Sequence, residues 1–180
     1  NVFTPKGRDE KVLDKLGWTG KKVALTVGRL QARKGQDMMI KAVPEIIKKI
    51  PNFLYAVVGD GDQKQELKRL VQELGLTKHV QFLSEISDEE MIECYQQCDL
   101  FILPNRTIGQ DIEGFGMVLV EAQSCGKPVI AGDSGGTKET MKVGETGFIV
   151  DATNPIKISE GILNIVLDEK KLLEMGSKAR

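Results

Sequence analysis

Residues 22–35 read KVALTVGRLQARKG, an apolar run that ends in glycine and passes into a short basic segment. The run over 22–28 is continuous rather than alternating, which is typical of a strand covered on both faces of its sheet. Gly35 then opens a segment with helical spacing over 36–50. This part of the chain therefore predicts a strand, a loop and a helix, and the same order recurs downstream.

Six short apolar runs are predicted as strands, and longer amphipathic segments separate them. The strands are expected at 22–28, 53–59, 79–83, 99–104, 127–132 and 147–150. The helices are expected at 36–50, 62–74, 88–97, 116–125, 136–142, 155–167 and 169–178. Pro44 is expected to kink or interrupt the first helix. Regular alternation of strand and helix predicts a doubly wound parallel α/β sheet of about six strands with right-handed crossovers.

Composition limits the classes of function. The chain has 180 residues, of which 41% are hydrophobic, and this suits one domain with its own core. The net charge is −1, so no overall field favours nucleic acid or an anionic membrane. No apolar run approaches the ~20 residues of a membrane span. The three cysteines match no zinc motif and are interpreted as reduced, buried thiols, which favours a cytoplasmic location.

Ligands of parallel α/β sheets bind beyond the carboxyl ends of the strands, so the loops there are the first candidates for a site. The loop GRLQARKG (28–35) carries Arg29 and Lys34 just before a helix N-terminus, where free N–H groups favour an anion. Arginine can bind two phosphate oxygens at once, and lysine adds a compact charge. The loop predicts a diphosphate site, with a solvated basic loop as the simpler alternative.

The loop after the second strand, GDGDQK (59–64), departs from the dinucleotide motif GxGxxG. Lys64 stands where that motif needs its third glycine for close helix packing, so an NAD site is not expected. Gly59 and Gly61 are interpreted as a tight turn that lets either a ligand or another stretch of backbone come near.

The long connection after the fourth strand leads into DIEGFGMVLVE (111–121), and long loops in compact α/β domains are often functional. Gly114 and Gly116 are expected to adopt backbone torsions closed to other residues. Four N–H groups at the start of the next helix would then be free to bind an anion. They belong to Phe115, Gly116, Met117 and Val118.

Two glutamates flank this glycine turn. Glu121 lies in an otherwise apolar helix start, where an unpaired buried carboxylate would be costly, so a partner is expected for it. Carboxylates are good acceptors for hydroxyl groups, and Glu113 and Glu121 beside an anion site suggest a ligand with both phosphate and sugar hydroxyls. The simpler alternative is that Glu113 is an exposed loop residue and Glu121 a solvated helix residue.

Six segments, in order, resemble the C-terminal half of a GT-B glycosyltransferase of the retaining family 4. They are GRLQARKG (28–35), VVGDGDQKQELKRL (57–70), VQFLSEISDEEM (80–91), DLFILPNR (99–106), EGFGMVLVEAQSCGKPVIAGDSGGTKE (113–139) and GETGFIV (144–150). Residues 105–136 are particularly similar to mannosyltransferases that modify phosphatidylinositol mannosides. The resemblance implies a Rossmann-like domain that forms one half of a GT-B fold.

The resemblance also implies a role for each candidate residue. Arg29, Lys34 and Glu113 would be the catalytic set: the cations would offset charge on the departing diphosphate, and Glu113 would meet the sugar hydroxyls. Glu121 would accept hydrogen bonds from the ribose. The other donor-binding residues would be Gly28, Gly59, Leu83, Ile86, Gly114, Phe115, Gly116, Met117 and Val118, with Leu83 and Ile86 beside the base. No metal or other cofactor is expected, and GDP-mannose precedes a UDP-hexose as the expected donor.

Residues 1–180 would then be the donor-binding domain, and the N-terminal domain that holds the acceptor, often with a catalytic histidine, would lie outside the chain. Any peripheral membrane association would be made by that other domain. We expect the chain to bind a nucleotide sugar weakly and to transfer nothing alone. Two alternatives stay open: another enzyme of this fold, such as a sugar-nucleotide epimerase or a phosphorylase-like enzyme, and a non-catalytic scaffold.

Overall fold

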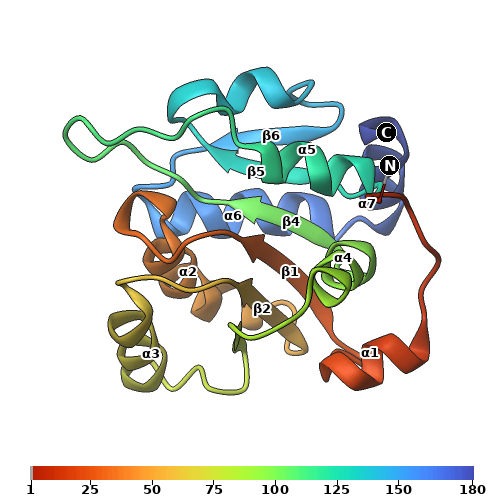
Figure 1. The fold of residues 1–180 in the computed structure, drawn as a ribbon, viewed down its shortest axis with the longest axis horizontal. Helices are drawn as coiled ribbons and strands as arrows, with labels where there is room; N and C mark the ends of the chain where they lie inside the picture. Colours follow the sequence, from red (N-terminus) through yellow and green to blue (C-terminus); the bar gives the residue numbers. More distant parts are fainter. Residues whose placement is uncertain (1) are drawn as a thin grey trace.

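Six parallel strands form one sheet in the order β3-β2-β1-β4-β5-β6, as the computed structural model shows for residues 2–180 (Figure 1). The strands are β1 (Lys22–Val27), β2 (Phe53–Val58), β3 (Val80–Leu83), β4 (Leu100–Leu103), β5 (Val129–Gly132) and β6 (Gly147–Val150). The chain winds from β1 outward to β3 and then returns to start again at β4, beside β1. The predicted doubly wound parallel sheet is confirmed.

Helices cover both faces of the sheet (Figure 1). They are α1 (Glu10–Leu16), α2 (Gln36–Ile47), α3 (Lys64–Glu73), α4 (Asp88–Gln97), α5 (Met117–Ser124), α6 (Pro155–Val166) and α7 (Glu169–Ala179). One apolar cluster joins the sheet to α2, α3 and α6, and the other joins it to α1, α4 and α5. Helix α7 contacts both α6 and α5. Two 3-10 helices, η1 (Ala32–Lys34) and η2 (Gly135–Thr140), lie in the connections after β1 and β5.

The strand residues alternate between the two apolar clusters, which explains why the apolar runs are continuous in the sequence. Ala24 and Ile102 belong to the cluster with α2 and α6, whereas Leu25 and Phe101 belong to the cluster with α4 and α5. All four side chains are fully buried. The central strands are therefore apolar on both faces.

Three expectations about helices need correction. Helix α2 runs through Pro44 without interruption and ends at Ile47 rather than at residue 50. The proline removes one backbone hydrogen bond, but the buried face of α2 packs along α6 and the sheet, and this packing outweighs the local loss. Helix α1 was not expected. The segment predicted as a helix over 136–142 is instead the 3-10 helix η2.

Helix α1 does carry terminal signals, although it is only seven residues long. The Asp9 side chain accepts hydrogen bonds from the N–H groups of Lys11 and Val12, which satisfies the start of the helix. Gly17 ends the helix with φ 73°, a left-handed conformation that favours glycine. Its buried residues Leu13 and Leu16 then pack against the α4 side of the sheet.

Candidate functional site

The loops that follow β1 and β4 lie side by side, because these two strands are neighbours where the strand order reverses. The Arg106 N–H donates to the carbonyl of Arg33 at 2.8 Å. The Arg106 guanidinium also donates to both Asp37 carboxylate oxygens, at 2.8 and 3.0 Å. Arg106 therefore attaches the loop after β4 both to the loop after β1 and to the first turn of α2.

Glu113 is the centre of this junction. It is only 6% exposed, and its Oε2 lies 2.6 Å from Lys34 Nζ and 2.9 Å from an Arg33 guanidinium nitrogen. A second Arg33 nitrogen pairs with Asp111 at 3.0 Å. A buried carboxylate requires such partners because its desolvation is otherwise uncompensated. Glu113 is thus a paired, buried group and not the exposed loop residue of the simpler alternative.

The backbone of Glu113 is held by the segment after β5. Its N–H donates to Ser134 Oγ at 3.3 Å. Gly135 has φ +61°, and a Cβ there would lie 1.7 Å from the Glu113 carbonyl oxygen. The buried Asn105 side chain joins the same region, since its amide donates to the Ser134 carbonyl at 3.1 Å and accepts from the Gly132 N–H at 3.0 Å. Glycine at 135 therefore permits a close approach that any side chain would block.

Helix α5 begins directly after the glycine turn. Gly116 caps it with φ 76°, as expected. Gly114 differs from the expectation: its φ is not positive and a Cβ there would meet nothing within 4 Å. Within residues 2–180, none of the N–H groups of Phe115, Gly116, Met117 and Val118 donates a hydrogen bond. Phe115 and Met117 are exposed, Val118 is half-buried and Gly116 is buried, so only part of this turn lies at the molecular surface.

Glu121 has a partner within the protein, whereas the need for one was taken from the sequence to favour a ligand. The Tyr95 hydroxyl donates to Glu121 Oε2 at 2.7 Å, and the glutamate is half-buried. Burial and the nearby Glu121 charge raise the pKa of Tyr95 well above its usual range, so the hydroxyl stays protonated and remains a donor. Glu121 is therefore fixed from inside the protein.

The glycines after β2 serve close backbone packing. Gly59 has φ +134°, and a Cβ there would lie 2.2 Å from the carbonyl oxygen of Gly28, which itself has φ +150°. A Cβ on Gly61 would lie 2.4 Å from the carbonyl oxygen of Leu30. The backbone of the loop after β1 thus comes near this turn, which is one of the two interpretations given from the sequence.

The remaining candidates lie around the same edge of the sheet. Arg29 is exposed, and its guanidinium forms no ion pair with any residue of the described range 2–180. Leu83 ends β3, and its carbonyl accepts from the Gly59 N–H at 3.0 Å. Leu83 and Ile86 are half-buried and pack against the apolar cluster of the α4 face.

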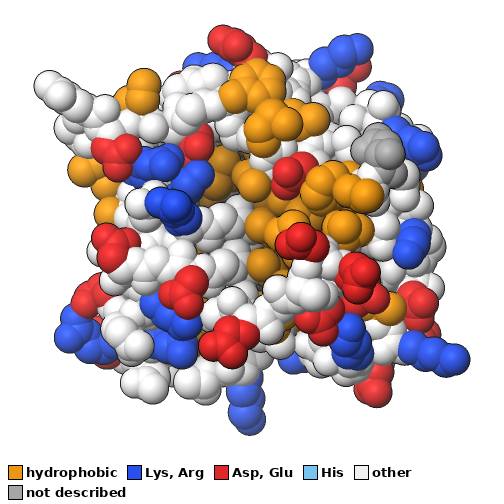
Figure 2. Space-filling model, viewed as in Figure 1, with side chains coloured by type: hydrophobic (Ala, Val, Ile, Leu, Met, Phe, Trp, Pro, Cys, Tyr) orange, Lys and Arg blue, Asp and Glu red, His pale blue; other side chains and the backbone are white. Residues whose placement is uncertain are grey.

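On the face shown in Figure 2, basic and acidic side chains are interspersed, and no large area carries one sign of charge. Among residues 2–180, no group of three or more His, Cys, Asp or Glu side chains is arranged to hold a metal ion. The sequence Asp60-Gly61-Asp62 forms no such group, and Asp60 pairs instead with Lys64 at 2.7 Å. Within the same range, no helix has the length and apolar character that crossing a membrane requires.

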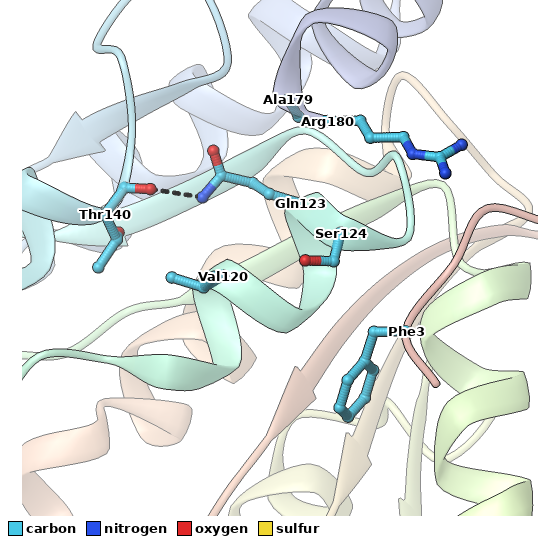
Figure 3. A pocket seen from close by; sticks show the side chains of 7 residues that line it. All are labelled: Phe3, Val120, Gln123, Ser124, Thr140, Ala179 and Arg180. Atoms are coloured by element: carbon cyan, nitrogen blue, oxygen red, sulfur yellow. Dashed lines mark hydrogen bonds between the residues drawn. The ribbon is translucent and has the colours of Figure 1, made fainter. Parts of the chain in front are cut away.

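A hollow of about 350 Å³ lies on the other side of α5 (Figure 3). Its lining residues are Phe3, Val120, Gln123, Ser124, Thr140, Ala179 and Arg180. The Gln123 amide spans part of it and donates to the Thr140 carbonyl at 2.6 Å. None of the expected site residues lines this hollow, so it is separate from the junction around Glu113.

The fold defines a Rossmann-like parallel α/β domain whose polar loops meet at the carboxyl edge of the sheet. The chain belongs to the family "Glycosyl transferases group 1", whose model matches residues 9–180. It is 37% identical over 94% of its length to a GDP-mannose-dependent alpha-(1-6)-phosphatidylinositol monomannoside mannosyltransferase of Mycolicibacterium smegmatis. It is also 37% identical, over 99% of its length, to a GDP-mannose-dependent monoacylated alpha-(1-6)-phosphatidylinositol monomannoside mannosyltransferase of Corynebacterium glutamicum. It spans about half of these relatives, 45% and 47% of their lengths.

Solved structures agree with this family. HepE of Anabaena, solved in complex with UDP, superposes with a TM-score of 0.88 and 28% identity, over 99% of this chain and 48% of HepE. The C-terminal domain of the group 1 glycosyl transferase LpcC of Francisella tularensis has the same fold, with a TM-score of 0.83 and 24% identity, over 99% of this chain and 92% of that one. The resemblance stated from the sequence motifs is confirmed.

Sequence reasoning missed several groups that shape the site, among them Arg33, Ser134 and Tyr95. Arg33 lies in the same basic segment as Lys34, so that segment held the signal, but no sequence rule says which cation reaches Glu113. Ser134 precedes the glycine pair of DSGG, which marks a tight turn after β5. Tyr95 is 26 residues from Glu121, and only the packing of α4 on α5 brings them together.

Proposed function

We propose that residues 1–180 form the donor-binding domain of a hexosyltransferase, which binds a nucleotide-diphospho-sugar at the carboxyl edge of the sheet. The observation that carries the proposal is the junction of Lys34 and Arg33 with the buried Glu113, directly before the free N–H groups of α5. It combines cations, backbone donors and carboxylate acceptors, which are the groups that a nucleotide sugar requires.

The diphosphate would bind Arg29, Lys34 and the N–H groups of residues 115–118. The Arg29 guanidinium is exposed and forms no ion pair among residues 2–180, so binding costs it no existing ion pair. Lys34 is only 13% exposed in its side chain and would turn from Glu113 toward the phosphate, while Arg33 keeps Glu113 paired. The partial positive charge at the start of α5 adds to this attraction.

The two carboxylates would hold the hydroxyl groups of the ligand. Glu113 follows the loop from β4 and would accept from the sugar, whereas Glu121 lies inside α5 and would accept from the ribose. A carboxylate presents about four lone-pair positions, so each can serve both its internal partner and a ligand hydroxyl. Leu83 and Ile86 would border the base with half-buried apolar surface.

GDP-mannose is the first candidate donor, because two relatives at 37% identity are named as GDP-mannose-dependent enzymes. A UDP-hexose is the second, because the structurally similar HepE was solved with UDP and with UDP-glucose. The acceptor would be held by an N-terminal domain outside residues 1–180. We expect retention of configuration without a bound metal, since Arg29, Lys34 and the α5 N-terminus can offset the charge on the departing diphosphate.

Calorimetric titration with GDP, UDP, GDP-mannose and UDP-glucose tests the proposal. Arg29→Ala and Lys34→Ala are expected to weaken the binding of whichever nucleotide the unaltered chain prefers. Lys48→Ala is the matched control: Lys48 Nζ also lies 2.6 Å from a glutamate, Glu45, but at the far end of α2. Unchanged affinity in both loop variants would show that the diphosphate assignment is wrong. No stabilisation by any of these nucleotides at millimolar concentration would favour the scaffold alternative.

A further inference from the structure

Tyr95 occupies an unusual position for a group that contacts the candidate site. Its side chain is 0% exposed, yet its hydroxyl reaches out of α4 to donate to Glu121 Oε2 at 2.7 Å. Within residues 2–180, no other hydrogen bond reaches the Glu121 carboxylate. One buried phenol therefore sets the direction of a carboxylate that is otherwise open to a ligand.

The Tyr95 ring is itself fixed from two sides. It stacks on Phe101 of β4 with centroids 5.4 Å apart and an interplanar angle of 21°. The edge contact with Phe3 has the same centroid distance, 5.4 Å, at 88°. Aromatic pairs in these geometries are favourable beyond their buried area, so the ring cannot translate without losing both contacts. The hydroxyl is thus a stationary donor.

A stationary donor lowers the conformational entropy that the Glu121 side chain loses when a ligand binds. A glutamate on a helix surface has several rotamers and loses that freedom when a ligand orders it. Donation by Tyr95 to Oε2 restricts those rotamers before any ligand arrives, and Oε1 keeps its lone pairs for other donors. The protonated phenol can sustain this role across the physiological pH range, because burial raises its pKa far above 10.

We propose that Tyr95 is a positioning residue that preorganises Glu121 to accept hydrogen bonds from the ribose hydroxyls of the bound nucleotide. The inference rests on the proposed function, which places the ribose at Glu121. It adds a residue that determines specificity from beneath the site. By positioning Glu121, Tyr95 makes the affinity depend on the ribose hydroxyls, although it does not contact the ligand.

The test compares Tyr95→Phe with the unaltered chain by calorimetry, using GDP and UDP and their 2′,3′-dideoxy counterparts. Phenylalanine keeps both ring contacts and removes only the hydroxyl. We expect Tyr95→Phe to weaken the preferred ribonucleotide about tenfold, equivalent to ~1.4 kcal/mol. Its affinity for the dideoxy nucleotide should be unchanged, because that ligand offers no hydroxyl to Glu121.

Tyr55→Phe is the matched control. Tyr55 is the other tyrosine of the chain; it is also 0% exposed, and its hydroxyl donates to Thr26 Oγ1 at 2.9 Å. It lies in β2 within the cluster on the opposite face of the sheet from Tyr95. Tyr55→Phe should lose a buried hydrogen bond without changing the affinity for either nucleotide.

The Glu121→Ala variant separates the ribose assignment of Glu121 from the positioning role of Tyr95. If Glu121→Ala leaves the ribonucleotide affinity intact, the ribose assignment fails and the role of Tyr95 fails with it. If Glu121→Ala weakens binding but Tyr95→Phe does not, only the positioning role is overturned. An equal loss for ribo- and dideoxynucleotides also overturns it, since packing alone would produce that result. In Glu121→Ala, the added Tyr95→Phe change should have no further effect on affinity.

Discussion

Glu113 and Glu121 are held by different chemistry, and this difference has functional consequences. Glu113 is enclosed by two cations, whereas Glu121 accepts one hydrogen bond from a neutral phenol. A ligand hydroxyl at Glu113 must share the carboxylate with Arg33 and Lys34. A hydroxyl at Glu121 meets a carboxylate whose charge no ion pair offsets among the residues described, 2–180.

The first prediction concerns the division of work between these carboxylates. Glu121→Ala should weaken binding of plain GDP or UDP, because the ribose contact is present without a sugar. Glu113→Ala should instead reduce the advantage of the nucleotide sugar over the plain nucleotide. Paired titrations with GDP and GDP-mannose, or UDP and UDP-glucose, measure both effects. An equal loss of plain-nucleotide affinity in the two variants would contradict this division.

The second prediction concerns Gly35, which joins η1 to α2 with φ +73°. A Cβ there would lie 1.7 Å from the Pro104 carbonyl oxygen, so Gly35→Ala should lower the free energy of unfolding by about 3 kcal/mol or more. Gly75 is the matched control, since φ is +68° and a Cβ would meet nothing within 4 Å. Gly75→Ala should cost only about 1–2 kcal/mol, the price of a left-handed alanine. Urea denaturation measures the free energy of unfolding of both variants. An equal decrease in the two would show that the close approach to Pro104 is unimportant.

At the level of single residues, sequence reasoning named residues of the candidate site but not the contacts among them. The positions of Glu113, Glu121, Lys34 and Gly116 followed from motifs whose spacing is local. The Lys34–Glu113 and Tyr95–Glu121 contacts did not, because each joins elements that are brought together only by the sheet order. Gly114 was assigned a special torsion that it lacks, since a glycine in a sequence does not reveal whether its freedom is used.

At the level of elements, a bidentate ion pair attaches the loop after β4 to α2. Arg106 holds both oxygens of Asp37 in α2, and its side chain is only 15% exposed. Bidentate pairs of this kind are stronger than single exposed ion pairs, because geometry is fixed and solvent screening is reduced. The clamp connects the segment that carries Glu113 to the helix that follows Lys34.

The third prediction is that Arg106→Ala loosens this loop selectively. Amide hydrogen exchange over residues 105–116 should become faster, while exchange in β4 and α2 changes little. Arg69→Ala is the control, because Arg69 pairs within α3 on an exposed surface. If exchange over 105–116 is the same in Arg106→Ala and the unaltered chain, the clamp does not order the loop.

The strands were the most predictable elements, because buried parallel strands leave continuous apolar runs such as FLYAVV (53–58). Helix α1 was missed because its seven residues offer few apolar positions, although Asp9 and Gly17 mark its two ends. The interruption expected at Pro44 does not occur, because α2 is continuous over Gln36–Ile47. A local rule about proline describes an isolated helix, whereas α2 is held along its length by α6 and the sheet.

At the level of the whole molecule, three buried thiols couple stability to pH. Burial raises the pKa of Cys94 and Cys98 to about 12 and that of Cys125 to about 11. The unfolded chain binds these protons less tightly, because its thiols have pKa values of about 8.5. The stability that the neutral thiols contribute is therefore complete below that pH and is lost as the pH rises toward the folded-state values.

The fourth prediction follows from this loss of stability at high pH. The free energy of unfolding should fall above about pH 9, with ~1.4 kcal/mol per pH unit for each thiol that ionises only in the unfolded chain. Urea denaturation between about pH 8 and 10.5 at constant ionic strength measures the slope. Cys94→Ala should reduce the slope by one thiol's contribution, whatever its effect on the baseline stability. An unchanged slope in that variant would contradict the assignment.

The position of β4 beside β1 also has a kinetic consequence. The Thr26 hydroxyl of β1 donates to the carbonyl of Ile102 in β4, 76 residues further along the chain. Closing so long a segment costs chain entropy before any contact repays it, and parallel pairings of high contact order form slowly. The candidate site can assemble only after this pairing, so during refolding the recovery of nucleotide affinity should lag behind the recovery of helical signal.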